Sequence, residues 1–266
     1  MTQPAPSDPA LTLAIDGAIA WITASNATRM NALTAAMWAA MPRHIAAAEA
    51  DANVRVIILR GAGTKAFSAG ADISEFESAR TGDAALHYDS LNHAAFEAIS
   101  GCAKPTLAMI HGYCLGGGLG LAACCDLRFA DDTSHFAIPA AKLGIGYNPR
   151  WVRPLLDLAR PSDVKELLFT GRRYKSAEAA AMGLVNRVFA SDMLEAETRA
   201  VAAVIAENAP LTIKAAKLSV DELTARPEHP DTQRLDAAVA ACFESADYAE
   251  GRRAFLEKRK PDFKGR

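Results

Sequence analysis

The feature that most constrains the fold is the run at 106–125, TLAMIHGYCLGGGLGLAACC, which carries no acidic residue, lysine or arginine. Its length matches the roughly 20 residues that a helix needs to cross a bilayer. The triplet Gly116–Gly118 is unfavourable inside such a helix. A buried strand, a glycine turn and a buried helix would have the same hydropathy. We therefore expect a strand–turn–helix corner in the core of an α/β domain.

The rest of the chain divides into a mixed first part and a helical last part. Alternating apolar residues around Gly17 predict a β-hairpin. The expected strands are Leu11–Ile15, Ile19–Thr23, Val54–Arg60, Ala66–Ser68, Thr106–Ile110, Leu127–Ala130 and His135–Ile138. One expected helix begins near Thr34 and is bent or restarted near Pro42, and two more begin near Asp83 and at Gly116. Beyond Pro149 the expected helices are Trp151–Leu158, Ser162–Phe169, Ser176–Met182, Met193–Glu207, Pro210–Leu223, Asp231–Phe243 and Tyr248–Lys258. Alternating strands and helices indicate α/β layering.

Composition excludes few classes of protein. The chain has 266 residues, 23% charged residues and a net charge of −2, so neither a nucleic acid nor another highly charged partner is implied. Five cysteines, an odd number without zinc-site spacing, are expected to be reduced packing residues. Residues 1–10 predict a disordered lead-in without signal-peptide features, and a cytoplasmic protein is expected.

Two small-residue corners are the candidate functional motifs. Residues 112–126 place Gly116–Gly118 between a strand and a helix, and residues 65–73 place Ala69, Gly70 and Ala71 at a second strand end. Backbone N–H groups at such corners can face a ligand oxygen, with the positive end of the helix dipole behind them. Neither corner follows the phosphate-loop or dinucleotide pattern closely. The corners therefore favour an oxyanion site.

At this point the sequence resembles a known family. FSAGADISEF, HGYCLGGGLGLAACCD, FAIPAAKLGIGY, LLFTGRRYKSAEAAAMGLVNRVF and APLTIKAAK are similar to the enoyl-CoA hydratase/isomerase (crotonase) superfamily. The resemblance implies a spiral of ββα units over residues 11–200. It also implies a helical region at 201–266 that forms a homotrimer or a dimer of trimers. The implied substrate is an acyl-CoA thioester, with no metal and no cofactor beyond its CoA moiety, and no nucleic-acid or membrane partner.

The resemblance also assigns binding residues. It maps the two oxyanion donors onto the N–H groups of Ala71 and Gly117, where they stabilise a thioester enolate. It places the adenine and pantetheine of CoA against Arg29, Ser68, Ala69 and Ile73. The C-terminal candidates for CoA contact are Lys260, Phe263 and Lys264, within a segment rich in lysine and arginine.

The sequence departs from the family at the two glutamates that activate water in hydratases. Gly120 and Ala140 stand at those positions, and neither side chain can move a proton. Two-glutamate hydration is therefore not expected, and a lyase step resembling decarboxylation is favoured. Tyr147-Asn148 resembles the methylmalonyl-CoA decarboxylase branch, although that branch has histidine where Ala71 stands. Tyr147 is accordingly predicted to line the acyl pocket.

Two alternatives stay open at this stage. One is a hydratase or isomerase whose base comes from another segment, such as Glu75 or Glu77, and the other is a catalytically silent acyl-CoA-binding protein. Weaker polar candidates are His87 and Tyr88 beside the acyl tunnel, and Arg150 as a partner for a substrate carboxylate. His111 and Asp126 are expected to be structural.

Overall fold

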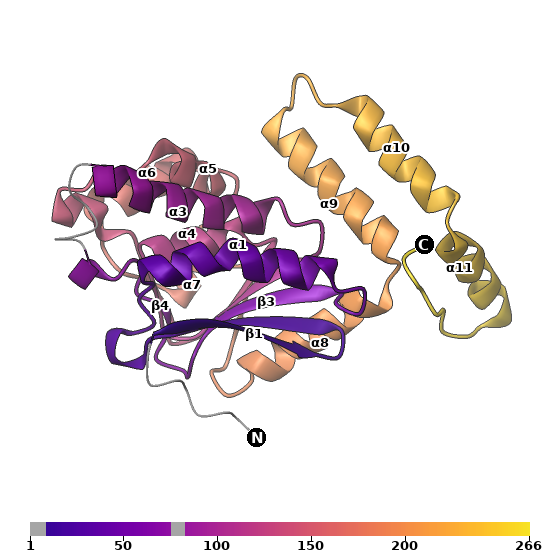
Figure 1. The fold of residues 1–266 in the computed structure, drawn as a ribbon, viewed down its shortest axis with the longest axis horizontal. Helices are drawn as coiled ribbons and strands as arrows, with labels where there is room; N and C mark the ends of the chain where they lie inside the picture. Colours follow the sequence, from indigo (N-terminus) through magenta and orange to yellow (C-terminus); the bar gives the residue numbers. More distant parts are fainter. Residues whose placement is uncertain (1–8, 76–82) are drawn as a thin grey trace.

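A computed structural model describes residues 9–75 and 83–266 of the chain, and it has an α/β architecture with two sheets (Figure 1). The larger sheet has six strands in the order β1-β2-β3-β5-β7-β10. Their bounds are Ala10–Asp16, Ile19–Ser25, Val56–Gly61, Thr106–Ile110, Leu127–Asp131 and Arg187–Phe189. The smaller sheet has the order β4-β6-β8-β9, with bounds Ala66–Ser68, Tyr113–Leu115, His135–Ala137 and Tyr174–Lys175.

The predicted hairpin is confirmed as β1 and β2, which pair antiparallel with Leu13 opposite Ile22. Gly17 has a φ of 58° at the turn, which favours glycine. Strand β1 already begins at Ala10, inside the predicted lead-in, whereas residues 1–8 lie outside the described part of the chain. From β2 to β10 the neighbouring strands of the larger sheet pair in parallel. Parallel pairing agrees with the fully buried run of β5.

Helices cover both faces of the larger sheet. Helices α1, Ala35–Ala50, and α3, Asp83–Ser100, lie over one face, whereas α8, Leu194–Glu207, lies on the other (Figure 1). Helix α1 is one continuous helix through Pro42, so the predicted restart there is wrong. Thr34 is its N-cap, because its side chain accepts a hydrogen bond from the N–H of Met37.

The remaining helices follow the sequence prediction within one or two residues. They are α4, Gly117–Cys124; α5, Pro149–Leu156; α6, Pro161–Thr170; α7, Ser176–Ala181; α9, Pro210–Ala225; α10, Thr232–Phe243; and α11, Ala246–Glu257. Three short strands, β6, β9 and β10, escaped the sequence prediction. Each has two or three residues, which is too short for a periodic pattern to show.

Helices α9, α10 and α11 project away from the sheets (Figure 1). They expose large apolar side chains, among them Phe243 at 62%, Phe255 at 83% and Leu256 at 79% exposure. Exposed apolar side chains of this size are common on surfaces that contact another protein. Among the described residues, no helix combines the length and the apolar character that a membrane span requires.

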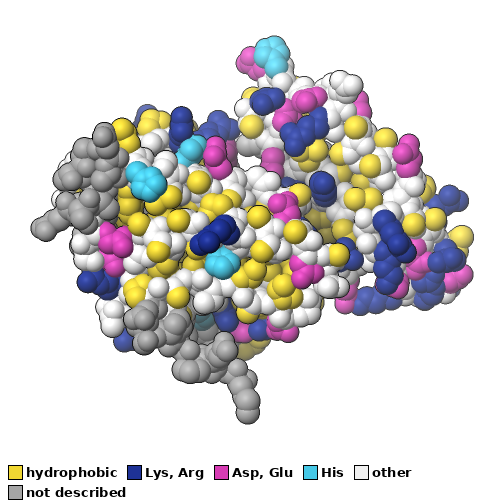
Figure 2. Space-filling view, in the orientation of Figure 1, with side chains coloured by type: hydrophobic (Ala, Val, Ile, Leu, Met, Phe, Trp, Pro, Cys, Tyr) yellow, Lys and Arg dark blue, Asp and Glu magenta, His cyan; other side chains and the backbone are white. Residues whose placement is uncertain are grey.

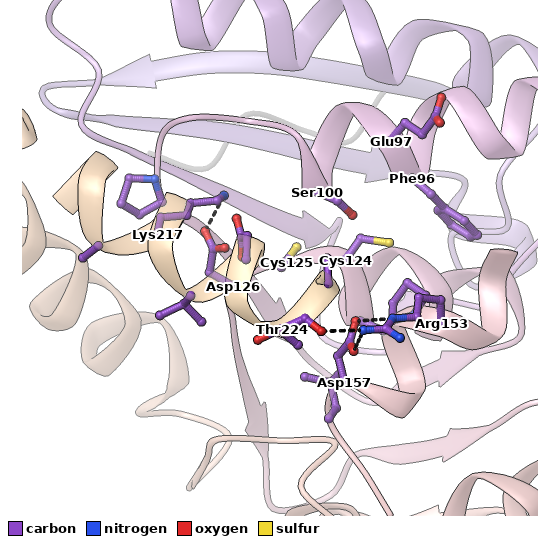
Figure 3. A pocket seen from close by; sticks show the side chains of 18 of the residues that line it. Phe96, Glu97, Ser100, Cys124, Cys125, Asp126, Arg153, Asp157, Lys217 and Thr224 are labelled. Carbon is purple, nitrogen blue, oxygen red and sulfur yellow. Dashed lines mark hydrogen bonds and ion pairs between the residues drawn. The ribbon is translucent and has the colours of Figure 1, made fainter. Parts of the chain in front are cut away.

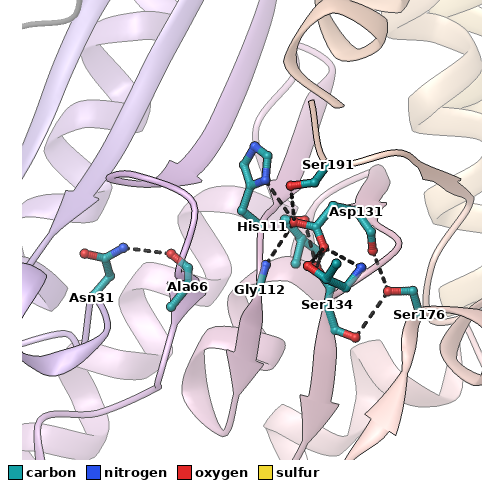
Figure 4. A network of polar contacts seen from close by, with 10 residues as sticks. Asn31, Ala66, His111, Gly112, Asp131, Ser134, Ser176 and Ser191 are labelled. Carbon is teal, nitrogen blue, oxygen red and sulfur yellow. Dashed lines mark hydrogen bonds and ion pairs between the residues drawn. The ribbon is translucent and has the colours of Figure 1, made fainter. Parts of the chain in front are cut away.

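Asp131 at the end of β7 ties the two sheets together (Figure 4). Its carboxylate lies 2.9 Å from Nδ1 of His111 and accepts hydrogen bonds from the N–H of Gly112 and the hydroxyl of Ser134. Burial alone would raise the pKa of Asp131, but the hydrogen bonds from His111, Thr133 and Ser134 hold it below its usual range. The structural role predicted for His111 is confirmed.

Candidate oxyanion site

The two small-residue corners touch each other through their backbones. Gly70 has a φ of +93°, and a Cβ atom placed there would lie 2.9 Å from the carbonyl oxygen of Leu115 and 3.0 Å from the nitrogen of Gly117. The first distance is shorter than real Cβ contacts, and the second is tighter than most of them. The first corner therefore reaches the second only because residue 70 is glycine.

The predicted donors, Ala71 and Gly117, both have unused N–H groups. The isolated bridge between Leu33 and Ala71 uses the carbonyl of Gly70 and the N–H of Asp72, which leaves the N–H of Ala71 free. Gly117 is the first residue of α4, where an N–H has no partner within the helix. Within the described residues neither group donates a hydrogen bond. Two adjacent free donors at a helix N-terminus suit an oxyanion.

Trp38 of α1 supports the second donor. A Cβ atom on Gly117 would lie 3.1 Å from Cζ2 of the Trp38 ring, so the indole packs directly against this residue. The indole is itself fixed, because its Nε1 donates a hydrogen bond of 3.1 Å to the hydroxyl of Tyr88. Tyr88 is 1% exposed. The structure thus places Tyr88 behind the donor corner, as a support for Trp38.

An aromatic ring fills the space beside Gly120. A Cβ atom there would lie 2.7 Å from Cζ of Phe96, which is part of α3. Ala140, the other position where the resemblance expects a hydratase glutamate, packs partly buried against the main core. A phenyl ring therefore lies beside Gly120 and a methyl group stands at position 140, and neither group can transfer a proton.

Phe96 belongs to a row of four rings in edge-to-face contact, which we call the aromatic row: Trp38, Phe96, Trp151 and Tyr147. The successive ring centroids are 5.8 Å, 5.9 Å and 5.6 Å apart. Such contacts fix ring orientation. The first ring of the aromatic row, Trp38, packs on Gly117, and the last ring is Tyr147. The row therefore connects the donor corner with the tyrosine predicted from the sequence.

The hydroxyl of Tyr147 is buried and has no hydrogen-bond partner among the described residues. Burial raises the pKa of Tyr147 well above its usual range, and the nearby thiols of Cys124 and Cys114 raise it further. The hydroxyl is therefore a neutral donor at physiological pH. Arg150, the candidate partner for a substrate carboxylate, is exposed at the first turn of α5.

The other acid–base candidates differ in what surrounds them. Oε2 of Glu75 accepts a hydrogen bond of 2.8 Å from the N–H of Ala35, at the start of α1. Glu77 lies outside the described residues. His87 is exposed, and its carbonyl accepts a hydrogen bond from Ser90.

The four N-terminal CoA candidates cluster beside the first corner. The guanidinium of Arg29, about half exposed, forms an ion pair of 2.8 Å with Asp72. Ser68 is buried and its hydroxyl accepts a hydrogen bond from the N–H of Gly70. Ala69 donates its N–H to the carbonyl of Met30, and Ile73 begins the 3-10 helix Ile73–Glu75. The fold thus brings Arg29, Ser68, Ala69 and Ile73 together.

The three C-terminal candidates lie elsewhere. Lys260 forms an ion pair with Glu207, Lys264 with Asp262, and the carbonyl of Phe263 accepts a hydrogen bond from Arg55. The C-terminus and strand β4, which holds Ser68, lie at opposite ends of the molecule (Figure 1). Within one chain these residues do not join the N-terminal candidates.

A groove of about 790 Å³ between α9 and the ends of α3, α4 and α5 was missed by the sequence analysis (Figure 3). Asp126, predicted to be structural, accepts hydrogen bonds from Thr106 and pairs with Lys217 across the groove at 2.8 Å. Phe96 and Cys124 also line it. The ring that packs on Gly120 therefore borders this groove. Only tertiary packing of α9 creates it, so no local sequence pattern could have revealed it.

Comparisons with known proteins agree with this geometry. Residues 14–266 match the family described as enoyl-CoA hydratase/isomerase. The chain belongs to the enoyl-CoA hydratase/isomerase family. It is 32% identical over 252 residues to the short-chain-enoyl-CoA hydratase of Clostridium acetobutylicum, covering 94% of this chain and 96% of the relative. It is 33% identical over 235 residues to the crotonyl-CoA hydratase of Syntrophomonas wolfei, covering 88% and 90%.

A solved structure extends the similarity to the whole fold. The enoyl-CoA hydratase/carnithine racemase from Magnetospirillum magneticum superposes with a TM-score of 0.93 at 38% identity, over 98% of this chain and 97% of that one. The predicted α/β fold of the family, with its C-terminal helices, is therefore confirmed. The chain is an acyl-CoA enzyme of this family, whose members differ in the reaction that they catalyse.

Proposed function

We propose that this enzyme is an acyl-CoA lyase that releases carbon dioxide from a malonyl-type thioester. One observation carries the proposal: the N–H groups of Ala71 and Gly117 have no partner among the described residues, whereas Gly120 and Ala140 supply no acid or base and Phe96 fills the space beside Gly120. A reaction that generates an enolate without removing a proton fits such a site.

The chemistry balances without a base. The bond between Cα and the carboxylate carbon breaks, and carbon dioxide leaves. The electron pair of that bond moves to Cα and onto the thioester oxygen, where the N–H groups of Ala71 and Gly117 stabilise the negative charge. A proton from water then reaches Cα and gives the shortened acyl-CoA. Each donor contributes about 3 kcal/mol to stabilisation of the transition state.

Tyr147 orients the carboxylate in this proposal. Its hydroxyl is protonated and lacks a partner within the described residues, so it can donate a hydrogen bond to a carboxylate oxygen. The Arg29, Ser68, Ala69 and Ile73 cluster holds the CoA moiety beside the first corner.

The test measures product formation from malonyl-CoA and methylmalonyl-CoA by mass spectrometry, with hydration of crotonyl-CoA measured in parallel. We expect carbon dioxide release together with a shortened acyl-CoA, and a rate that falls about tenfold or more in Tyr147→Phe. The role of Tyr147 is refuted if this variant decarboxylates at the rate of the unmodified enzyme. The lyase proposal itself is refuted if only crotonyl-CoA is converted.

Hydration or isomerisation is the second candidate, because the relatives above are named hydratases. Its base would be Glu75 or Glu77. The carboxylate of Glu75 lies at the start of α1 in contact with Ala35. Hydration that persists in the double variant Glu75→Gln/Glu77→Gln rules out these bases. Tight binding of acyl-CoA without turnover across a broad panel would instead support the third candidate, a silent acyl-CoA-binding protein.

We also propose that the enzyme is a homotrimer or a dimer of trimers, assembled through α9, α10 and α11, and that it works in the cytoplasm. The exposed Phe255 and Leu256 support an assembly contact. In a trimer, Lys260, Phe263 and Lys264 of one chain can meet the CoA bound to a neighbour. Sedimentation of the enzyme and of Phe255→Ser/Leu256→Ser tests this proposal: a monomeric unmodified enzyme contradicts it.

A further inference from the structure

Two polar atoms of the aromatic row have no hydrogen-bond partner. They are Oη of Tyr147 and Nε1 of Trp151, and both are buried within the described structure. Trp151 is 6% exposed. Buried polar atoms are almost always paired, because an unpaired one loses its hydrogen bonds to water without replacement. Two such atoms on neighbouring rings point to a ligand that pairs with both.

The two rings continue the aromatic row that starts with Trp38, whose indole packs on the donor Gly117. Tyr147 and Trp151 are in edge-to-face contact, with centroids 5.6 Å apart, and Trp151 in turn contacts Phe96 at 5.9 Å. Phe96 packs on Gly120, one turn along α4 from the donor Gly117. The unpaired atoms are therefore joined to the oxyanion corner by direct ring contacts.

Building on the proposed function, we propose that Trp151 and Tyr147 form a two-donor subsite for an oxygen atom on C3 of the acyl group. The indole N–H can only donate, and the phenol donates as well, so their common partner is an acceptor. The substrate class is then thioesters with a carboxylate or a carbonyl at C3. Saturated acyl chains, which lack an acceptor there, leave both donors unpaired.

The subsite also explains why a carboxylate is reactive in this position. Both donors are neutral, and the surrounding aromatic row is apolar, so a carboxylate loses its hydration without gaining a positive partner among the rings. Loss of carbon dioxide removes that charge. Trp151 is thus assigned as a specificity-determining residue that touches the group to be released.

The test compares acetoacetyl-CoA with butyryl-CoA by titration calorimetry. The two acyl groups have the same carbon chain and differ by the oxygen on C3, and neither can release carbon dioxide. The variants are Trp151→Phe and Tyr147→Phe. Trp21→Phe is the matched control, because Nε1 of Trp21 is also buried and unpaired but belongs to the cluster of β2 and β3 on the other face of the sheet.

We expect Trp151→Phe to weaken acetoacetyl-CoA binding about three- to tenfold, the effect of one hydrogen bond, and to leave butyryl-CoA binding unchanged. Tyr147→Phe should act in the same direction, and Trp21→Phe should change neither affinity. Butyryl-CoA binding also reports that each variant is folded. An equal loss for both ligands in Trp151→Phe, or no loss for either, overturns the proposal.

The outcome is separable from that of the proposed function. A preference for acetoacetyl-CoA that Trp151→Phe abolishes supports the subsite even if malonyl-type thioesters are not decarboxylated. The opposite outcome is that Trp151→Phe decarboxylates malonyl-type thioesters at the rate of the unmodified enzyme and binds acetoacetyl-CoA and butyryl-CoA with unchanged affinity. That result overturns the subsite but supports the lyase reaction.

Discussion

Adding a side chain at Gly120 should destabilise the protein through Phe96. In Gly120→Ala the new Cβ lies 2.7 Å from Cζ of Phe96, too close for van der Waals contact. The phenyl ring cannot turn away freely, because it lies between Trp38 and Trp151 at 5.8 Å and 5.9 Å. Overpacking of this kind costs about 1 to 3 kcal/mol, offset by up to about 1 kcal/mol from the higher helix propensity of alanine. The expected loss is about 1 to 2 kcal/mol.

A double-mutant cycle with Phe96→Leu isolates this contact. The smaller leucine leaves room for the methyl group, so Gly120→Ala should become neutral or slightly stabilising in that background. The coupling is about 2 kcal/mol. The assay is chemical denaturation at a fixed protein concentration, since assembly would shift the apparent stability.

Gly251→Ala is the matched control. This glycine lies inside α11, where a Cβ would meet Phe263 at an ordinary 3.5 Å. The change should stabilise the protein slightly or leave it unaltered. The reasoning is refuted if Gly120→Ala is as mild as Gly251→Ala, or if Phe96→Leu leaves its cost unchanged.

Three further predictions concern other parts of the fold. Asp131→Asn should lower the free energy of unfolding by about 2 to 4 kcal/mol at pH 7. Because the pKa of Asp131 is depressed in the folded protein, the stability difference between the two proteins should shrink as the pH falls below about 4 in urea titrations. A stability difference that stays constant from pH 7 to pH 3 contradicts this. Lys217→Met leaves Asp126 without its ion-pair partner and should lower the free energy of unfolding by about 1 to 3 kcal/mol. Hydrogen exchange in α9 should become faster, and unchanged exchange there would show that this ion pair does not hold α9 in place. Burial raises the pKa of Cys124 to about 11, so iodoacetamide at pH 8 should modify the more exposed Cys242 first. Early modification of Cys124 in peptide mass maps would contradict its burial.

Sequence patterns predicted the corners well because glycine and alanine act locally. Gly70 has a φ of +93° and touches a neighbouring backbone, which only glycine can do without strain. In the apolar run 106–125, the triplet Gly116–Gly118 favoured a buried corner over a membrane helix. The absence of carboxylates at Gly120 and Ala140 was likewise visible from the residues alone.

The sequence could not reveal which side chain fills the space beside Gly120. Phe96 lies in another helix, and its contact with Gly120 depends on how α3 packs on α4. The unpaired Nε1 of Trp151 is also a property of packing, since nothing in the neighbouring residues distinguishes a satisfied indole from an unsatisfied one. The strands β6, β9 and β10 form by pairing with longer or earlier strands, so their own two or three residues carried no signal.

The central claim is that the N–H groups of Ala71 and Gly117 polarise a thioester carbonyl. Infrared difference spectroscopy of butyryl-CoA labelled with ¹³C at the carbonyl measures this directly. Ala71→Pro is the matched variant, because it removes one N–H that has no partner among the described residues. The residue before the new proline is Gly70, and glycine tolerates the backbone restriction that proline imposes on its predecessor. The bound carbonyl should absorb at lower frequency than in solution, with the shift reduced in Ala71→Pro. A bound frequency equal to that of free butyryl-CoA would contradict the oxyanion site.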